Sequence, residues 1–130
     1  MIPCDTLLLS VGLIPENELT AQAGIPMDRI TNGALVDGDR QTKIEGVFAC
    51  GNVVHVNDLV DNVSAESEEA GKYAALYAMG KLPENNGAAD LVTGNNVRYL
   101  CPQSIMKADG DEKVSVYFRV LAPEFNVKLV

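Results

Sequence analysis

An apolar stretch at residues 42–52, followed by a loop and a long helix, carries the residue types that suit a cofactor contact. Gly51 stands where a strand is expected to end, and a glycine there lets a ligand approach the backbone closely. The start of a helix presents unpaired N–H groups and a partial positive charge to an anionic or electron-rich group. The pattern therefore predicts a cofactor site made by the strand end and the helix start.

The residues of this stretch, TKIEGVFACGN, resemble the second FAD-binding motif of the two-dinucleotide-binding-domain flavoproteins, T-x-x-x-G-V-F-A-x-G-D. Upstream, DTLLLSVGLIPEN at residues 5–17 is similar to the D-x-v-x-x-x-x-G-x-x-P-N segment of that family. Together with the following helix, the resemblance covers residues 3–80. It implies an FAD-dependent pyridine nucleotide-disulfide oxidoreductase-like protein, nearest to the glycerol-3-phosphate dehydrogenase-like bacterial oxidoreductases, which passes electrons between NAD(P)H and a small substrate or acceptor.

The resemblance also implies which residues contact the cofactor. The final Asp of the motif accepts a hydrogen bond from the ribityl chain of FAD, and Asn52 is the matching residue. Its amide oxygen can still accept from a hydroxyl, but a neutral bond in place of a charge-assisted one costs about 1 kcal/mol, roughly fivefold in affinity. Backbone N–H groups near Asn62, Val63 and Ser64 are expected at the flavin pyrimidine edge, so these residues, Asn52 and Gly51 are the predicted cofactor-binding residues.

The sequence lacks the G-x-G-x-x-G fingerprint that holds the FAD pyrophosphate, and it also lacks a separate NAD(P)-binding fingerprint. We therefore expect a partial FAD site, with NAD(P) bound only through a missing upstream domain. The expected partners are the missing N-terminal FAD and NAD(P) domains, and the isolated chain should bind FAD weakly and be inactive. No catalytic or metal-binding residue is predicted.

Two other classes of protein stay open. Strand surfaces without neighbours could pair with another chain or with a second copy of this chain. The chain would then be a non-catalytic interaction or dimerisation module, and pairing with a second copy would give a homo-oligomer. An unrelated small α/β binding domain with an accidental motif match is the third interpretation.

The remaining polar candidates are His55 and three acids of the helix. His55, the single histidine, could face a substrate or donate a proton near the flavin. A surface or interface histidine is the favoured interpretation. Glu66, Glu68 and Glu69 are interpreted as a solvated face near a helix start rather than as acid–base groups.

Composition narrows the class of protein further. The 130 residues carry a formal net charge of −8 without a basic patch, which disfavours nucleic acid as a partner. No apolar run approaches the roughly 20 residues of a membrane span, and no secretory signal is recognisable at the N-terminus, so a cytoplasmic protein is expected. Cys4, Cys50 and Cys101 are far apart and are expected to be buried, reduced thiols.

The elements that position these residues follow from apolar patterns and turn residues. We expect buried strands at residues 5–11 and 46–52, a short strand at 34–37, and a short helix at 16–23 capped by Gly24. The long helix should run from Asp61 or Asn62 to Met79, with Gly80 as its cap. Its small residues share one face that should pack on a sheet: Ser67, Ala70, Gly71, Ala74 and Ala78.

The predicted fold class is α/β (mixed α+β): a partial FAD/NAD(P)-binding domain with a long C-terminal helix, followed by a small β-rich segment. Residues 1–81 form the C-terminal part of the FAD-binding domain, residues 82–96 a linker, and residues 97–130 a β-rich segment that is expected to be truncated. Strands are predicted at residues 97–101, 113–120 and 127–130, with a hairpin connection near 109–111.

Overall fold

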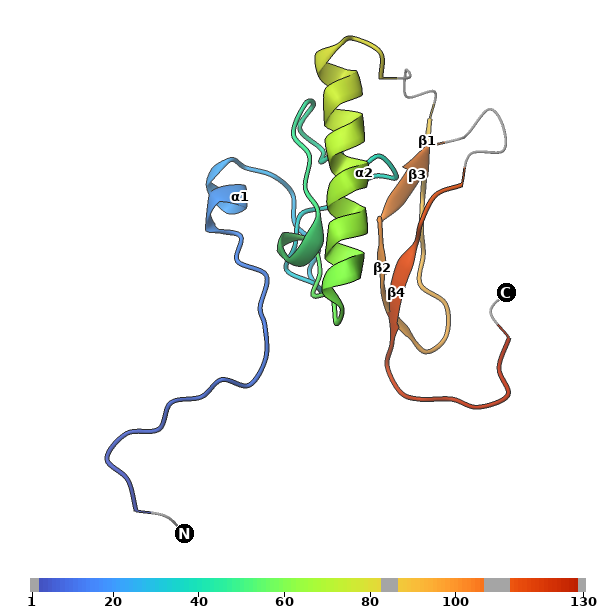
Figure 1. The fold of residues 1–130 in the computed structure, drawn as a ribbon. Helices are drawn as coiled ribbons and strands as arrows, with labels where there is room; N and C mark the ends of the chain where they lie inside the picture. Colours follow the sequence, from blue (N-terminus) through green and yellow to red (C-terminus); the bar gives the residue numbers. More distant parts are fainter. Residues whose placement is uncertain (1–2, 83–86, 107–112, 129–130) are drawn as a thin grey trace.

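The computed structural model describes residues 3–82, 87–106 and 113–128. Within these ranges the order of elements is α1 (Glu18–Gln22), the 3-10 turn η1 (Gly51–Val53), α2 (Val60–Ala78), β1 (Ala88–Asp90), β2 (Val97–Cys101), β3 (Ser104–Met106) and β4 (Tyr117–Val120). Figure 1 shows the strands on one side of α2 and α1 on the other. This mixed α/β arrangement with small sheets agrees with the predicted fold class and is compatible with a partial domain.

The long helix α2 forms where the sequence predicts it, and it lies in the middle of the chain. Gly80, with φ of 65°, ends it: the Gly80 N–H donates to the Tyr77 carbonyl and the Lys81 N–H to the Leu76 carbonyl. These two bonds make a Schellman motif. Gly24 ends α1 in the same way, with φ of 72°. No helix of the described residues combines the length and the apolarity that a membrane span requires.

The face of α2 that packs inward differs from the predicted small-residue face. Ala70 is buried, but Ser67, Gly71 and Ala78 are exposed, and a side chain at Gly71 would have nothing within 4 Å. The buried face instead includes Glu66 and Ala70. The prediction that these small residues pack together against a sheet is wrong for the described residues, because three of the five are exposed.

Two antiparallel pairs of strands follow α2. β2 pairs with β4, and β1 pairs with β3. The strand predicted at 97–101 is confirmed, whereas only Tyr117–Val120 of the strand predicted at 113–120 is regular. Val127 and Lys128 form no strand, and residues 129–130 and the connection near 109–111 lie outside the described residues. β1 forms within the predicted linker at 82–96, of which residues 83–86 lie outside the described residues.

The loops between α1 and α2 supply the core without forming regular strands. The strands predicted at 34–37 and 46–52 are wrong as regular elements: their residues take part only in the isolated bridges Met27–Ala34, Val36–Thr42 and Gln41–Phe48. Tight turns separate them, one held by Asp37, whose carboxylate accepts the Gln41 N–H at 2.9 Å. Such turns leave too little chain for longer ladders. Ala34, Val36, Val54 and Cys101 nevertheless pack into one buried cluster.

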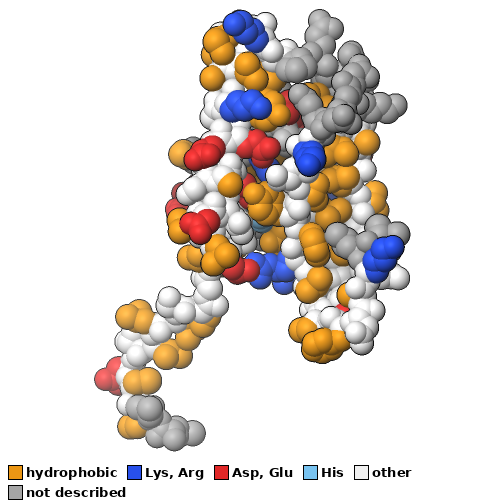
Figure 2. Space-filling view, turned by 45° about the vertical axis from the view of Figure 1, so that its right-hand side comes forward, with side chains coloured by type: hydrophobic (Ala, Val, Ile, Leu, Met, Phe, Trp, Pro, Cys, Tyr) orange, Lys and Arg blue, Asp and Glu red, His pale blue; other side chains and the backbone are white. Residues whose placement is uncertain are grey.

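Residues 3–16 extend away from the body of the molecule (Figure 1), and the Asn17 side chain anchors the end of this segment by donating to the carbonyls of Asn32 and Val53, each at 2.8 Å. The buried strand predicted at 5–11 is therefore wrong: Leu8 is 91% exposed and Val11 is 87% exposed. Figure 2 shows hydrophobic side chains along this segment. The sequence pattern is that of a strand covered on both faces, but no described strand lies beside it to complete the backbone ladder. Its apolar side chains stay in contact with solvent.

Candidate functional site

Gly51 connects the end of the motif to helix α2. Its φ of 67° lies in the left-handed region, and a Cβ there would stand 3.0 Å from Cγ1 of Val63. The Gly51 N–H donates to Oε2 of Glu66 at 2.7 Å. The glycine is thus required for close approach of the helix, whereas the sequence pattern suggested close approach of a ligand. Its backbone donor is already engaged within the chain.

Asn52 follows at the surface of the molecule. Its side chain is exposed, and its Oδ1 accepts the Asn57 N–H at 3.0 Å. An amide oxygen has two lone pairs, so this bond leaves one acceptor position open to solvent or to a ligand. Asn52 therefore holds the turn up to Asn57 and keeps the capacity for the predicted hydroxyl contact.

The start of α2 lies against η1, and helix and turn are in contact. The helix begins at Val60, and its N-cap residue Leu59 makes no side-chain capping bond. The N–H groups that lack an intrahelical carbonyl therefore lie in the first turn before Asn62, because the Asn62 N–H already donates to the Leu59 carbonyl at 3.2 Å. Val63 and Ser64 lie later in the helix than these open donors. Asn62 is half-buried, and Ser64 is exposed.

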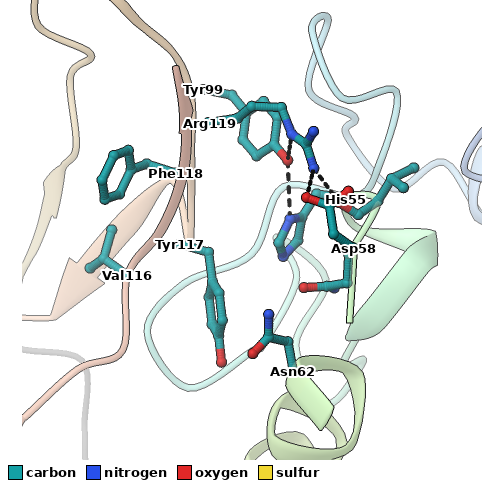
Figure 3. A pocket seen from close by; sticks show the side chains of 10 residues that line it. His55, Asp58, Asn62, Tyr99, Val116, Tyr117, Phe118 and Arg119 are labelled. Carbon is teal, nitrogen blue, oxygen red and sulfur yellow. Dashed lines mark hydrogen bonds and ion pairs between the residues drawn. The ribbon is translucent and has the colours of Figure 1, made fainter. Parts of the chain in front are cut away.

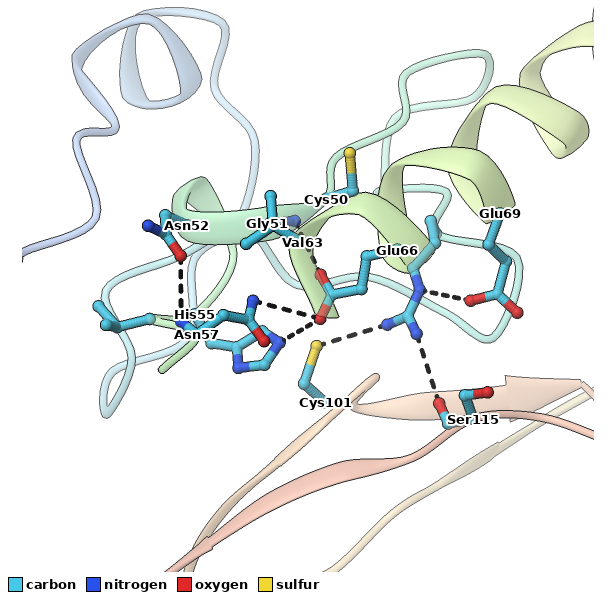
Figure 4. Close-up of polar contacts among 12 residues, drawn as sticks. Cys50, Gly51, Asn52, His55, Asn57, Val63, Glu66, Glu69, Cys101 and Ser115 are labelled. Atoms are coloured by element: carbon cyan, nitrogen blue, oxygen red, sulfur yellow. Dashed lines mark hydrogen bonds and ion pairs between the residues drawn. The ribbon is translucent and has the colours of Figure 1, made fainter. Parts of the chain in front are cut away.

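His55 is buried, with 3% of its surface exposed, so the prediction of a surface or interface histidine is wrong. Its Nδ1 lies 3.4 Å from the Tyr99 hydroxyl (Figure 3), and its Nε2 lies 2.7 Å from Oε1 of Glu66 (Figure 4). The rings of Tyr99 and Tyr117 lie within 6 Å of the imidazole ring. A buried carboxylate at one ring nitrogen fixes the orientation of the imidazole and presents the other nitrogen to its surroundings.

Glu66 is completely buried, which corrects the prediction that the acids near the helix start form a solvated face. Burial by itself raises the pKa of the Glu66 carboxyl. The hydrogen bonds from His55 and from the Gly51 N–H, and the nearby charges of His55 and Arg40, outweigh that effect and hold the pKa below its usual value. Glu66 is therefore an anion that organises the motif end. Glu68 is exposed, as predicted.

Arg40 joins α2 to the strands from a completely buried position. Its Nε donates to Glu69 at 3.0 Å, its Nη2 to the Ser115 carbonyl at 3.4 Å, and its Nη1 lies 3.6 Å from Sγ of Cys101 (Figure 4). The guanidinium also stands 5.4 Å from the ring centre of Tyr117. The network fixes the side of α2 that carries Glu66, and so it supports the motif end indirectly.

The cysteines differ in environment. Cys101 is buried, and burial raises the pKa of its thiol to about 12 although Arg40 acts in the opposite direction. Cys50 is partly buried and Cys4 is exposed, so the prediction of buried thiols holds for Cys101 alone. All three are free. Within the described ranges, no group of three His, Cys, Asp or Glu side chains is placed to hold a metal ion.

Sequence reasoning did not find the pairing of His55 with Glu66 or the burial of Arg40. The partners are 11 residues apart in the first case, and Arg40 meets Cys101 across 61 residues. No local spacing rule joins residues at such separations. The single usable signal was that Glu66 falls on the same helical face as Ala70, four residues later.

Comparison with known proteins identifies the family. The sequence model of the family described as pyridine nucleotide-disulphide oxidoreductase matches residues 1–71. The chain belongs to this family. The pyridine nucleotide-disulphide oxidoreductase assignment confirms the predicted family, and the matched range includes both motifs, α1, η1 and the first part of α2.

Two curated relatives of the chain are named as reductases. Putidaredoxin reductase CamA of Pseudomonas putida is 29% identical over 94 residues, which cover 67% of this chain and 21% of the relative. Probable ferredoxin reductase CtmF of Castellaniella defragrans is 36% identical over 53 residues, which cover 41% of this chain and 12% of the relative. The chain thus spans about a fifth or less of either relative. No solved structure matches.

The family implies FAD and NAD(P) as cofactors, and the residues present can be tested against FAD. Asn52 is exposed and retains an acceptor position, which suits a ribityl hydroxyl. The uncapped first turn of α2 suits the pyrimidine edge, with Val60 and Asp61 as donors just before the predicted Asn62, whose own N–H is engaged by the Leu59 carbonyl. Gly51 offers no free N–H. The arrangement therefore fits a partial flavin contact at Asn52 and the helix start.

Proposed function

We propose that the chain is part of an FAD-dependent, NAD(P)-linked oxidoreductase, and that it contributes the contacts to the ribityl chain and the pyrimidine edge of the flavin. The observation that carries the proposal is the exposed side chain of Asn52. It stands beside the uncapped start of α2, on a backbone that the buried carboxylate of Glu66 holds in place. The family match over the same residues supports it.

Within this proposal, bound FAD would supply the hydride chemistry, and the chain would bind and orient it. In this arrangement the Asn52 side chain accepts a hydrogen bond from a ribityl hydroxyl, and the first-turn N–H groups face the electron-rich edge of the flavin ring. The pyrophosphate and adenine half, and NAD(P), bind to FAD and NAD(P) domains beyond this chain. We expect those domains to cover the exposed apolar segment 7–14. We also expect them to cover an open pocket with a volume of about 830 Å³, lined partly by Leu19, Phe48 and Val53.

The electron acceptor or donor divides into two candidate classes. The resemblance to glycerol-3-phosphate dehydrogenase-like bacterial oxidoreductases favours a small substrate. The names of the two relatives favour a ferredoxin or putidaredoxin as the acceptor. The two classes separate when the complete flavoprotein, reduced with NADH or NADPH, is offered each acceptor in turn.

A second candidate function rests on a specific observation. Leu8, Val11 and Ile14 are 91%, 87% and 80% exposed on unpaired extended backbone. Such a segment can add as a strand to the sheet of another chain or of a second copy. The alternative is therefore a non-catalytic interaction or dimerisation module, without a bound cofactor.

The flavin proposal is tested by titrating the chain into FAD and following flavin fluorescence and absorbance. Asn52→Asp restores the charged acceptor of the family motif and should tighten FAD binding about fivefold, whereas Asn52→Ala should weaken it. Asn95→Ala, at another exposed asparagine, serves as the matched control and should change nothing. If neither the chain nor its Asn52→Asp variant alters the flavin signal at millimolar FAD, the interaction module becomes the better description.

A further inference from the structure

A small cavity opens between the loop after the motif and the strands β2 and β4. Its volume is about 260 Å³, which equals roughly nine waters at liquid density. Figure 3 shows His55, Asn62 and Tyr117 around the same space, with Tyr99 and Arg119 at its other end. Three separate parts of the chain therefore form its walls, and the flavin proposal assigns none of these side chains except Asn62.

The charged groups in and behind the cavity wall already have partners within the chain. The Glu66 carboxylate accepts hydrogen bonds from His55 and from the Gly51 N–H, both at 2.7 Å, and Arg119 faces the carboxylate of Asp58 at 2.8 Å. A ligand with a full positive or negative charge would have to compete with one of these contacts. The chain as a whole is also acidic, with a net charge of −8, which repels anions. An uncharged ligand meets neither obstacle.

The polar groups of the wall are suited to hydroxyl groups. Because the Glu66 carboxylate accepts a hydrogen bond at Nε2, the proton of a neutral imidazole is placed there and Nδ1 becomes an acceptor. Nδ1 lies 3.4 Å from the Tyr99 hydroxyl, which is a long bond that a ligand hydroxyl can replace with a shorter one. The Tyr99 hydroxyl and the Asn62 amide can each donate and accept.

We propose that this cavity binds a small, uncharged, polyhydroxylated compound, one hydroxyl of which donates to Nδ1 of His55. The Tyr99 hydroxyl and the Asn62 amide hold neighbouring hydroxyls, and the ring of Tyr117 lines the apolar side. All of these side chains belong to this chain, so binding requires no flavin. Since Asn62 also lies in the first turn of α2, the compound would lie beside the proposed flavin position.

The test is an NMR titration of the chain, without flavin, with erythritol as the probe. The ring signals of His55 and the side-chain amide of Asn62 should shift saturably, with a Kd of about 1–10 mM as expected for eight non-hydrogen atoms. Two matched probes replace one terminal CH2OH of erythritol by a carboxylate (erythronate) or by an aminomethyl group (1-amino-1-deoxyerythritol). Both should bind at least fivefold more weakly.

Variants locate the binding. Tyr99→Phe should weaken erythritol binding about 2- to 10-fold, the range for one neutral hydrogen bond, and His55→Gln should weaken it at least tenfold. Tyr77→Phe, at a tyrosine outside the cavity, is the control and should leave the Kd unchanged. If His55→Gln does not fold, Tyr99→Phe and Asn62→Ala decide the question. The proposal is overturned by absence of saturable shifts up to 100 mM erythritol, by tighter binding of either charged probe, or by equal losses in Tyr77→Phe and Tyr99→Phe.

Discussion

Substitution of Glu66 by glutamine tests the central claim that a buried carboxylate organises the motif end. Glu66 accepts its two short bonds, both 2.7 Å, from the Gly51 N–H and from His55. Glutamine keeps the shape, but its single amide oxygen can accept only one of these bonds, now as a neutral bond, and its NH2 group can bond to Nε2 of His55 only if the imidazole proton moves to Nδ1. The difference between a charge-assisted and a neutral bond is about 1 kcal/mol, so Glu66→Gln should lower the free energy of unfolding by about 2 kcal/mol.

Urea denaturation followed by circular dichroism measures this loss, which amounts to a midpoint shift of about 1 M for an m-value near 2 kcal/mol/M. The pH dependence has a defined sign. Because the folded pKa of Glu66 lies below its ordinary value of 4.5, its contribution is complete above pH 4.5 and is lost as the pH falls through the folded pKa. The difference in the free energy of unfolding between wild type and Glu66→Gln should therefore become smaller on acidification.

Glu68→Gln is the matched control, because Glu68 lies on the same helix and is exposed. It should change the free energy of unfolding by less than about 0.5 kcal/mol. The reasoning is refuted if Glu66→Gln matches Glu68→Gln at neutral pH, or if the loss in Glu66→Gln stays constant down to pH 3.

Three further predictions concern glycine, arginine and cysteine. Gly51→Ala should lower the free energy of unfolding by about 2 kcal/mol, because of the positive φ and the contact with α2. Gly71→Ala, in open space within the helix, should raise it by about 1 kcal/mol. The two variants should shift the urea midpoint in opposite directions. Arg40→Met leaves the partly buried carboxylate of Glu69 unpaired and should cost about 3 kcal/mol in the same assay. Cys101, with a thiol pKa of about 12, is a thiolate in roughly one molecule in 10⁴ at pH 8 and should resist iodoacetamide until the chain unfolds. The exposed Cys4 should react first, and mass spectrometry of the alkylated chain shows the order of labelling.

The parts of the fold that depend on local signals were predictable from the sequence. Helix α2 has a run of good helix formers and a terminal Gly80, and its Schellman motif requires nothing from the rest of the chain. The strand at 97–101 was equally local in origin. The family was recognisable because its motifs, ending at Asn17 and Asn52, are contiguous in sequence.

What depends on distant partners was not predictable. The strand at 5–11 has the composition of a buried strand, but a strand also needs a neighbour for its backbone, and composition does not report whether one is present. Likewise, the environment of Glu66 is set by His55 and by the loop at Gly51, so its helical position alone suggested solvent. The predicted contacts at Asn62, Val63 and Ser64 stay predictions, with the open donors of the first turn displaced toward Val60.

The apolar cluster that unites Ala34, Val36 and Val54 with Cys101 has a consequence for how this chain can be divided. Cys101 comes from a strand that follows the family-matched residues, yet it fills the interior of the loops that carry the motif. A shortened version ending after α2 would leave that interior open to water and Arg40 without its contact to Ser115. The strands after α2 therefore close one side of the core beneath the motif loops. We expect the two parts to occur together in related chains and to unfold in a single transition.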